Sequence, residues 1–205
     1  GYLEVHGGTF ETVVCDNNHT SSVFYALYAA GEAGTVQCII HDGTFKTAGN
    51  YTAVLIGNDN TNGDGGINAD ACSYIYGGTF LAPEGVSAVK VSPNTANSSV
   101  LYGGSYSMLG ETDALPYVAA ECRTVEATEG GVSYVVQART EEDTDAVAKV
   151  GDKVYASLQT AIDAAEGGTA VLLKDTAESI TVSGDRTVTL DLGGNTLTNT
   201  AGSHT

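Results

Sequence analysis

The sequence predicts an all-β protein, a right-handed parallel β-helix (β-solenoid), with one short amphipathic capping helix near residues 157–166. The first observation is a motif of two turn-forming residues, a Thr or Ser and an aromatic ring, which recurs at spacings of 35, 35 and 26 residues. A motif at a near-fixed period is typical of repeat proteins. Its four copies are Gly7-Gly8-Thr9-Phe10, Asp42-Gly43-Thr44-Phe45, Gly77-Gly78-Thr79-Phe80 and Gly103-Gly104-Ser105-Tyr106.

The second observation is that strand-forming stretches accompany the motif. One short apolar stretch precedes each copy, another lies between copies, and Gly, Asn and Pro turns separate them. The preceding stretches are 3–6, 36–41, 73–76 and 99–102, and the intervening ones are 23–28, 52–56 and 87–91. This pattern predicts coils whose strands pair in parallel through residues 1–137, with like positions about 4.8 Å apart.

Stacked coils align like side chains into rows along the axis of the solenoid. The alignment predicts a buried aromatic row of Phe10, Phe45, Phe80 and Tyr106. It also predicts a buried aliphatic row of Val5, Ile40, Ile75 and Leu101. Each of these side chains contributes roughly 1.5–3 kcal/mol when buried, so the rows can form a core. The glycine before each ring allows a tight corner that a Cβ would block.

The chain changes character after residue 137. Residues 138–148 are polar and acidic and are predicted to form a linker. Residues 149–205 are predicted to hold the capping helix and the first strands of a second β-helix segment. The helix begins after Ser157, a good N-cap residue, and ends before Gly167.

The apolar residues of the predicted helix fall on one face, at the spacing i, i+3, i+4, i+7. They are Leu158, Ala161, Ile162 and Ala165. This face is expected to cover the open end of a strand stack, because an uncovered stack exposes unpaired strand edges. Strands are predicted after the helix at 169–173, 179–182, 187–192 and 196–198.

The residues that follow the linker resemble the opening of right-handed β-helix, pectate-lyase-like domains of large surface proteins of Gram-positive anaerobes. The stretches that carry this resemblance are Val154–Ala165, Gly168–Asp175 and Thr187–Leu197. The first part of the chain resembles the closing section of such a domain. That section ends in a segment similar to Tyr117–Cys122 and a final strand like Ser133–Val136, although Glu121-Cys122 stands where a Gly-Tyr-like pair is expected.

The resemblance covers nearly all of the chain and implies a bacterial protein that is secreted or attached to the cell wall. Fold alone does not assign its function, because this superfamily holds lyases, hydrolases, adhesins and stalks. The chain opens inside one repeat and closes on a half-finished one, which predicts that it is part of a longer chain.

The charge balance is strongly acidic, with 25 Asp and Glu against 8 Lys and Arg and a formal net charge of −17. Nucleic acid is therefore excluded as a partner, because its phosphates need basic contacts. Unaided binding of anionic membranes or polyuronates is disfavoured for the same reason. Plain solubility also explains such a charge. No signal peptide or transmembrane run is visible, so no membrane insertion is expected.

Four cysteines, Cys15, Cys38, Cys72 and Cys122, are too scattered for a zinc knuckle. Cys38 and Cys72 occupy nearby positions of the repeat but are one residue out of register. They are expected to point to opposite faces, so that a disulfide between them would need a bulge. Buried free thiols are the favoured interpretation.

An outward stripe of rings is the predicted ligand-binding site. The residue that follows each inward aliphatic residue is His6, His41, Tyr76 or Tyr102, and Tyr74 lies on the same face. Stacked rings on a flat face could bind the sugar rings of a glycan or a host or bacterial surface protein. The alternative is that the rings stack on one another and only stiffen the sheet.

A loop rich in Asn and Gly is the predicted metal site. Asn60, Asn62, Asp64 and Asn68 occupy positions 1, 3, 5 and 9 of a calcium loop, although Ala71 replaces the carboxylate at position 12. The alternative is a loop inserted into a coil. No cofactor is predicted apart from this calcium ion.

No catalytic set is visible, so the chain is predicted not to be an enzyme. Lyases of this fold need a basic residue near a calcium site, and hydrolases need paired acids. The arginines lie outside the repeats, and acids such as Asp175, Glu178 and Asp191 are expected to be solvated and unpaired. The predicted function is a non-catalytic cell-surface module for adhesion, for carbohydrate or protein binding, or for spacing. The alternative is a fragment of a pectate-lyase-like carbohydrate-active enzyme, a lyase or a glycoside hydrolase.

Overall fold

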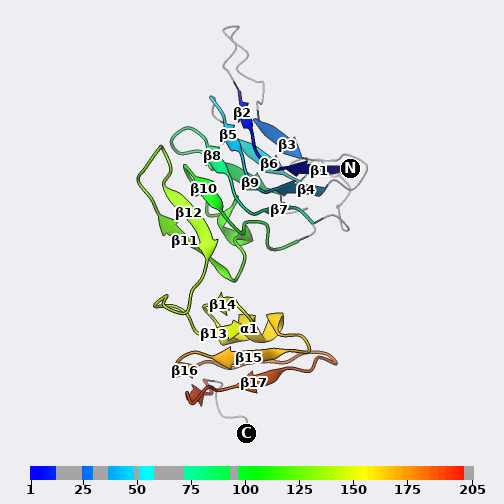
Figure 1. Ribbon diagram of the computed structural model, residues 1–205, viewed down its shortest axis with the longest axis vertical. Coiled ribbons are helices and arrows are strands. Elements are labelled where there is room, and N and C mark those ends of the chain that lie inside the picture. Colours follow the sequence, from blue (N-terminus) through cyan, green and yellow to red (C-terminus); the bar gives the residue numbers. More distant parts are fainter. Residues whose placement is uncertain (13–24, 30–36, 49–50, 58–71, 93–96, 201–205) are drawn as a thin grey trace. The chain divides into compact units, whose positions relative to one another are not determined.

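The computed structural model describes residues 1–12, 25–29, 37–48, 51–57, 72–92 and 97–200, which are mostly β-strands with one α-helix (Figure 1). The predicted β-rich character is confirmed. The chain forms two compact units. Unit 1 comprises Gly1–Ala119 and Thr124–Gln137, and unit 2 comprises Ala120–Arg123 and Ala138–Thr205.

The first sheet of unit 1 collects the strands that precede the motifs. Strands β1 (Tyr2–Val5), β4 (Gln37–Ile40) and β7 (Tyr74–Ile75) pair in parallel in the order β1-β4-β7 (Figure 1). The register aligns Val5 with Ile40 and Ile40 with Ile75, which is one repeat at each step. Isolated parallel bridges continue this column from Ile75 to Leu101 and from Leu101 to Val118.

Two further parallel sheets take the remaining strands of the repeats. The motif strands β2 (Thr9–Glu11), β5 (Thr44–Lys46), β8 (Thr79–Leu81) and β10 (Gly104–Tyr106) lie side by side in that order. The intervening strands β3 (Leu27–Ala29), β6 (Val54–Ile56) and β9 (Val89–Val91) form the other sheet. Each of the first three repeats therefore contributes one strand to each of three sheets.

The core of unit 1 contains both predicted rows. The aromatic rings of Phe10, Phe45, Phe80 and Tyr106 stack with centroids 4.9, 5.0 and 4.9 Å apart and interplanar angles of 3°, 4° and 9°. The last three are fully buried, whereas Phe10 is half-buried because it ends the row. The aliphatic row is buried as well. These two predictions are confirmed.

The last strands of unit 1 correct the prediction of parallel pairing through residue 137. Strand β12 (Tyr134–Ala138) pairs antiparallel with β10, and β11 (Cys122–Glu126) lies next to β12. Only residues 127–133 connect β11 to β12, and a connection of this length is too short for the crossover that parallel strands need. The turn contains Gly130 and Gly131, whose φ angles are +64° and +79°. The chain therefore reverses here instead of adding another parallel strand.

Three of the cysteines lie in the described part of the chain. Cys38, Cys72 and Cys122 are thiols rather than disulfide-bonded. The register aligns Ile39 with Tyr74, so Cys72 lies one residue before the position that faces Cys38. The backbone N–H of Cys38 instead donates to Ser73 Oγ at 3.0 Å. Cys72 is only half-buried, contrary to the prediction, and Cys15 lies outside the described residues.

Burial also controls the chemistry of the two enclosed thiols. It raises the pKa of both Cys38 and Cys122 to about 11. Because the thiolate is the reactive form, these side chains are apolar packing groups at neutral pH.

Unit 2 has a four-stranded sheet in the order β14-β13-β15-β17 and a two-stranded one. Its strands are β13 (Ala148–Val150), β14 (Lys153–Tyr155), β15 (Thr169–Leu172), β16 (Thr176–Ala177), β17 (Thr189–Asp191) and β18 (Leu197–Thr198). Strand β13 pairs antiparallel with β14 and β15, while β15–β17 and β16–β18 are parallel.

The strand predicted at 179–182 is absent, and the strand of this region is β16, at Thr176–Ala177. The physical reason is competition from side chains. The backbone N–H of Thr181 donates to Gln159 Oε1 at 2.7 Å, and Ser179 Oγ donates to Asn199 Oδ1 at 2.8 Å. The contact of Thr181 takes a backbone donor that strand pairing would use.

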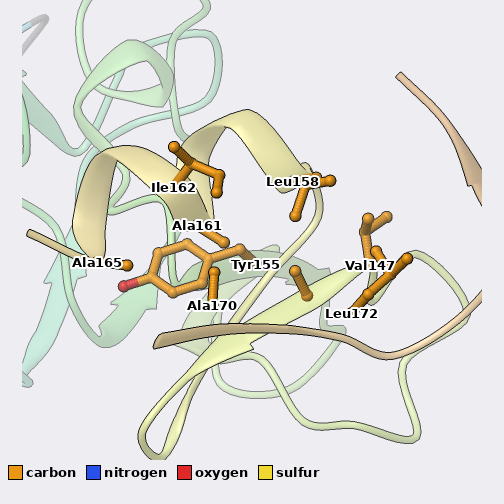
Figure 2. Packing of buried hydrophobic residues seen from close by; sticks show 9 residues of the cluster. Val147, Tyr155, Leu158, Ala161, Ile162, Ala165, Ala170 and Leu172 are labelled. Atoms are coloured by element: carbon orange, nitrogen blue, oxygen red, sulfur yellow. The ribbon is translucent and has the colours of Figure 1, made fainter. Parts of the chain in front are cut away.

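The predicted helix is present as α1 (Leu158–Ala164), shorter than the expected 157–166. Ser157 Oγ accepts from the N–H of Thr160, so this residue is the N-cap as predicted. Gly167, with φ of +70°, lies just beyond the end of the helix. Figure 2 shows the helix above Tyr155 and the sheet, with its apolar side chains in contact with this layer. Leu158, Ala161 and Ile162 of the helix are buried as expected, and so is Ala165, the residue that caps its C-terminal end.

Glu178 is half-buried at the start of α1, not solvated as predicted. Its Oε1 accepts from Ser157 Oγ at 2.7 Å and from Gln159 N at 3.0 Å, and its Oε2 accepts from Leu158 N at 2.9 Å. Burial alone would raise the pKa of Glu178, but the three hydrogen bonds outweigh it and lower the pKa below its ordinary value. The carboxylate therefore satisfies N–H groups that a helix leaves without partners.

We expect unit 2 to lose stability in acid through this group. A pKa that is lower in the folded state stabilises the fold above the unfolded-state pKa, about 4.3. The stabilisation is lost as the pH falls through the folded-state value. Thermal denaturation between about pH 3 and pH 7 should show a steeper acid loss in the wild type than in Glu178→Gln. The exposed control Glu166→Gln should keep the wild-type slope, and equal slopes in all three proteins would contradict the prediction.

Candidate functional site

A row of four rings, which we call the ring row, runs along the sheet of β1, β4 and β7. His6, His41 and Tyr76 come directly after these strands, and Tyr102 follows Leu101 in the same column. The rings of His6 and His41 stack with centroids 4.6 Å apart and an interplanar angle of 3°. His41 and Tyr76 are 5.6 Å apart at 23°, and Tyr76 and Tyr102 are 5.5 Å apart at 43°.

The repeat explains the alignment of the ring row. Each ring follows a buried aliphatic residue, and successive side chains of an extended chain point to opposite faces. The side chain of His6 is 71% exposed and that of His41 39%, while Tyr76 is 47% exposed. Tyr102 is half-buried. The sequence therefore predicts the position of the rings correctly, with Tyr102 less open than the others.

Tyr74 adds a second ring beside the row. Its centroid lies 5.8 Å from that of Tyr76 and 5.9 Å from that of Tyr102, at interplanar angles of 15° and 59°. These three tyrosines form one patch, whereas the two histidines occupy the other end of the row. All five predicted ligand-binding residues are thus brought together on one face of unit 1.

Glu4 completes the histidine end, and the sequence analysis did not assign it to the site. Its Oε1 lies 2.9 Å from His41 Nε2 and 3.3 Å from His6 Nε2. Its Oε2 accepts from the hydroxyl of Tyr2 at 2.7 Å. The hydrogen bonds from Tyr2 and then His41 hold the pKa of Glu4 below its ordinary value, and Glu4 in turn raises the pKa of Tyr2.

A signal for this cluster exists in the sequence. Glu4 and His6 are two residues apart on one face of a strand, and His41 is the residue one repeat after His6. The three ligand-type atoms all lie within 4.8 Å of one another. The spacing of Glu4 and His6 on one strand face, rather than the alignment of the repeats, is the signal that identifies Glu4.

The predicted calcium loop gains no support or correction from the structure. Asn60, Asn62, Asp64 and Asn68 lie outside the described residues, so the calcium site stays a prediction.

Unit 1 also has a hollow of about 420 Å³, and none of the predicted site residues lines it. Its lining includes one carboxylate, Glu84, and no Lys, Arg or His. The residues that line it are Ala82, Pro83, Glu84, Gly85, Ser107, Met108, Gly131, Ser133 and Tyr134. This hollow therefore has neither the paired acids of a hydrolase nor the base of a lyase.

The three arginines of the chain are engaged within unit 2. Arg123 pairs with Asp143 at 2.8 Å, Arg139 with Asp145, and Arg186 with Asp163 at 3.6 Å. The Arg139 guanidinium lowers the pKa of Asp145. These contacts give the arginines structural roles.

No protein-family model, curated protein or solved structure matches the chain. None of the described helices has the length and apolar character needed to span a bilayer.

Proposed function

We propose that the chain is a non-catalytic module of a secreted or cell-wall-attached bacterial surface protein. In this proposal, the repeats of unit 1 through β10 form a right-handed parallel β-helix, and the ring row binds a glycan of neutral charge. The observation that carries the function is the row itself, with rings from successive repeats stacked on one accessible face.

The strand pairing supports the fold. The first three repeats each add one strand to each of three parallel sheets, which is the connectivity of a coiled chain. Crossover connections between parallel strands are right-handed in about 98% of cases. In unit 2, Ala170 pairs with Leu190 and Thr176 with Leu197, which fits the first short coil of a second segment capped by α1.

The chemistry of the row supports binding of sugar rings. Tyrosine offers an apolar face and a hydroxyl at its edge, a combination that is enriched at interfaces. Three such rings are present, and the centroids of Tyr74, Tyr76 and Tyr102 lie 5.5 to 5.9 Å apart. The net charge of −17 disfavours an anionic glycan, so a neutral one is the first choice.

The enzyme alternative has less support. A glycoside hydrolase requires two carboxyl groups across a cleft, and a lyase requires a base beside the substrate. The hollow near Glu84 has one carboxylate instead of the two that a hydrolase requires. Glu4, beside the ring row, is already hydrogen-bonded to Tyr2 and His41.

The change Tyr76→Ala should weaken glycan binding by about 1 kcal/mol or more, since aromatic anchors dominate such contacts. The free energy of unfolding should change by less than about 0.5 kcal/mol, as for most exposed positions. Binding is measured on an array of neutral glycans and then by calorimetry, and stability is measured by chemical denaturation.

The matched control is Tyr134→Ala, which removes a ring from the hollow and leaves the ring row intact. It should not change glycan binding. Loss of binding in Tyr134→Ala alone would place the ligand in the hollow and contradict the proposal. A large stability loss in Tyr76→Ala, with no glycan bound by the wild type, would make the row a structural ladder and the module a spacer.

A further inference from the structure

We infer that Glu4, His6 and His41 form a binding site for a divalent transition metal ion, zinc in the first place. The site lies at the histidine end of the ring row and shares His6 and His41 with it, but it uses their Nε2 atoms rather than their ring faces and is tested with zinc alone. It is also separate from the predicted calcium loop.

The donor set selects the class of metal. Imidazole nitrogen suits zinc, copper and nickel, whereas magnesium and calcium prefer oxygen ligands alone. Two imidazoles and one carboxylate are also the protein ligands of open zinc sites, in which water takes the fourth position. Side chains 39% and 71% exposed at His41 and His6 leave room for that water.

The distances suit a single small ion. Donor atoms of a tetrahedral zinc ion, bound at about 2.0–2.1 Å, lie roughly 3.3 Å apart. Glu4 Oε1 already lies 3.3 Å from His6 Nε2 and 2.9 Å from His41 Nε2. All three donor atoms lie within 4.8 Å of one another. The planes of the two imidazoles are parallel to within 3°, so these exposed rings must rotate out of their stack before both Nε2 atoms can point at one ion.

The strand pairing places the three proposed ligand residues side by side on one face. His6 and His41 follow paired residues, because Val5 is aligned with Ile40 in a parallel ladder. Glu4 lies two residues before His6 and therefore shares its face. Tyr2 holds the second carboxylate oxygen at 2.7 Å, which is the type of outer hydrogen bond that orients metal-binding carboxylates.

The test is a zinc titration of the full chain, followed by calorimetry and by competition with a chromogenic chelator. We expect one zinc ion at this site, with affinity reduced more than about tenfold in each of Glu4→Gln, His6→Gln and His41→Gln. The positioning variant Tyr2→Phe should weaken binding by about tenfold. The control is Glu11→Gln, a carboxylate that pairs with Lys46 instead. It should bind zinc as the wild type does.

Cobalt substitution gives an independent readout, since it separates nitrogen and oxygen ligands from the thiolates of the cysteines. The absorption spectrum should show d–d bands without thiolate charge transfer, and His41→Gln should abolish these bands. Unchanged circular dichroism of the variants excludes unfolding as the cause. No zinc binding, zinc binding that survives all three ligand changes, or a thiolate spectrum would each overturn the inference.

Discussion

Replacing Phe45 by alanine should lower the free energy of unfolding of unit 1 by about 3–5 kcal/mol. Phe45 is 0% exposed, and its ring lies between those of Phe10 and Phe80 at 4.9 and 5.0 Å. Removing the middle ring of a stack takes contacts from both neighbours. Parallel strands on each side hold the backbone apart, so the cavity cannot close fully, and the full cavity cost is expected.

The measurement is chemical denaturation of the complete chain, combined with hydrogen exchange of individual amides. Protection should fall for β4, β5 and β8 and stay unchanged for β15, because the two units have separate cores. Phe10→Ala is the control, since this ring is half-buried and stacks on one ring among the described residues. It should cost clearly less. Equal losses in the two variants would show that the row is not the core of unit 1.

The repeat is the reason why so much of unit 1 could be predicted. Alignment of the motif glycines fixes the register, and the register then fixes which residues stack. Ile40 lies opposite both Val5 and Ile75, and Phe45 lies opposite both Phe10 and Phe80. The outward position of His41 follows from the same register. These predictions needed only the spacing of the motifs along the chain.

The missed features depend on contacts that no local pattern encodes. Strand β12 turns back because only residues 127–133 connect it to β11, and its antiparallel pairing with β10 does not follow the repeat. The predicted strand at 179–182 is lost because Gln159, on the helix, takes the N–H of Thr181. The sequence predicts that Glu178 is a solvated surface acid, and only the fold brings it to the N–H groups of Leu158 and Gln159.

The candidate site shows the same division. The rings recur from repeat to repeat and can be predicted, whereas Glu4 occurs in one repeat only and gives no such signal. Its partner Tyr2 also has no equivalent, since Gln37 is aligned with Tyr2 in the next repeat. A ligand residue that occurs in one repeat only therefore cannot be predicted from the repeat.

The glycine of the motif corner is the second position where a large effect is expected. Gly78 has a φ of +109°, a conformation that side chains rarely adopt. A Cβ at this position would lie 3.0 Å from the carbonyl oxygen of Gly43 and 3.3 Å from the ring of Phe80. The same carbonyl oxygen accepts from the N–H of Thr79 at 2.7 Å. A methyl group would therefore push two stacked corners apart and weaken the hydrogen bond between them.

Gly78→Ala should destabilise unit 1 by roughly 2–6 kcal/mol, the sum of about 1–3 for backbone strain and about 1–3 for overpacking. Gly8→Ala separates the two causes. Gly8 has almost the same φ, +104°, but among the described residues a Cβ there meets only Phe10, at 3.8 Å. It should show the strain alone, about 1–3 kcal/mol. Denaturation curves of the two variants, compared with the wild type, measure the difference directly. A Gly78→Ala protein no less stable than Gly8→Ala would mean that adjacent corners are not in contact, and the stacking of the repeats at this corner would have to be abandoned.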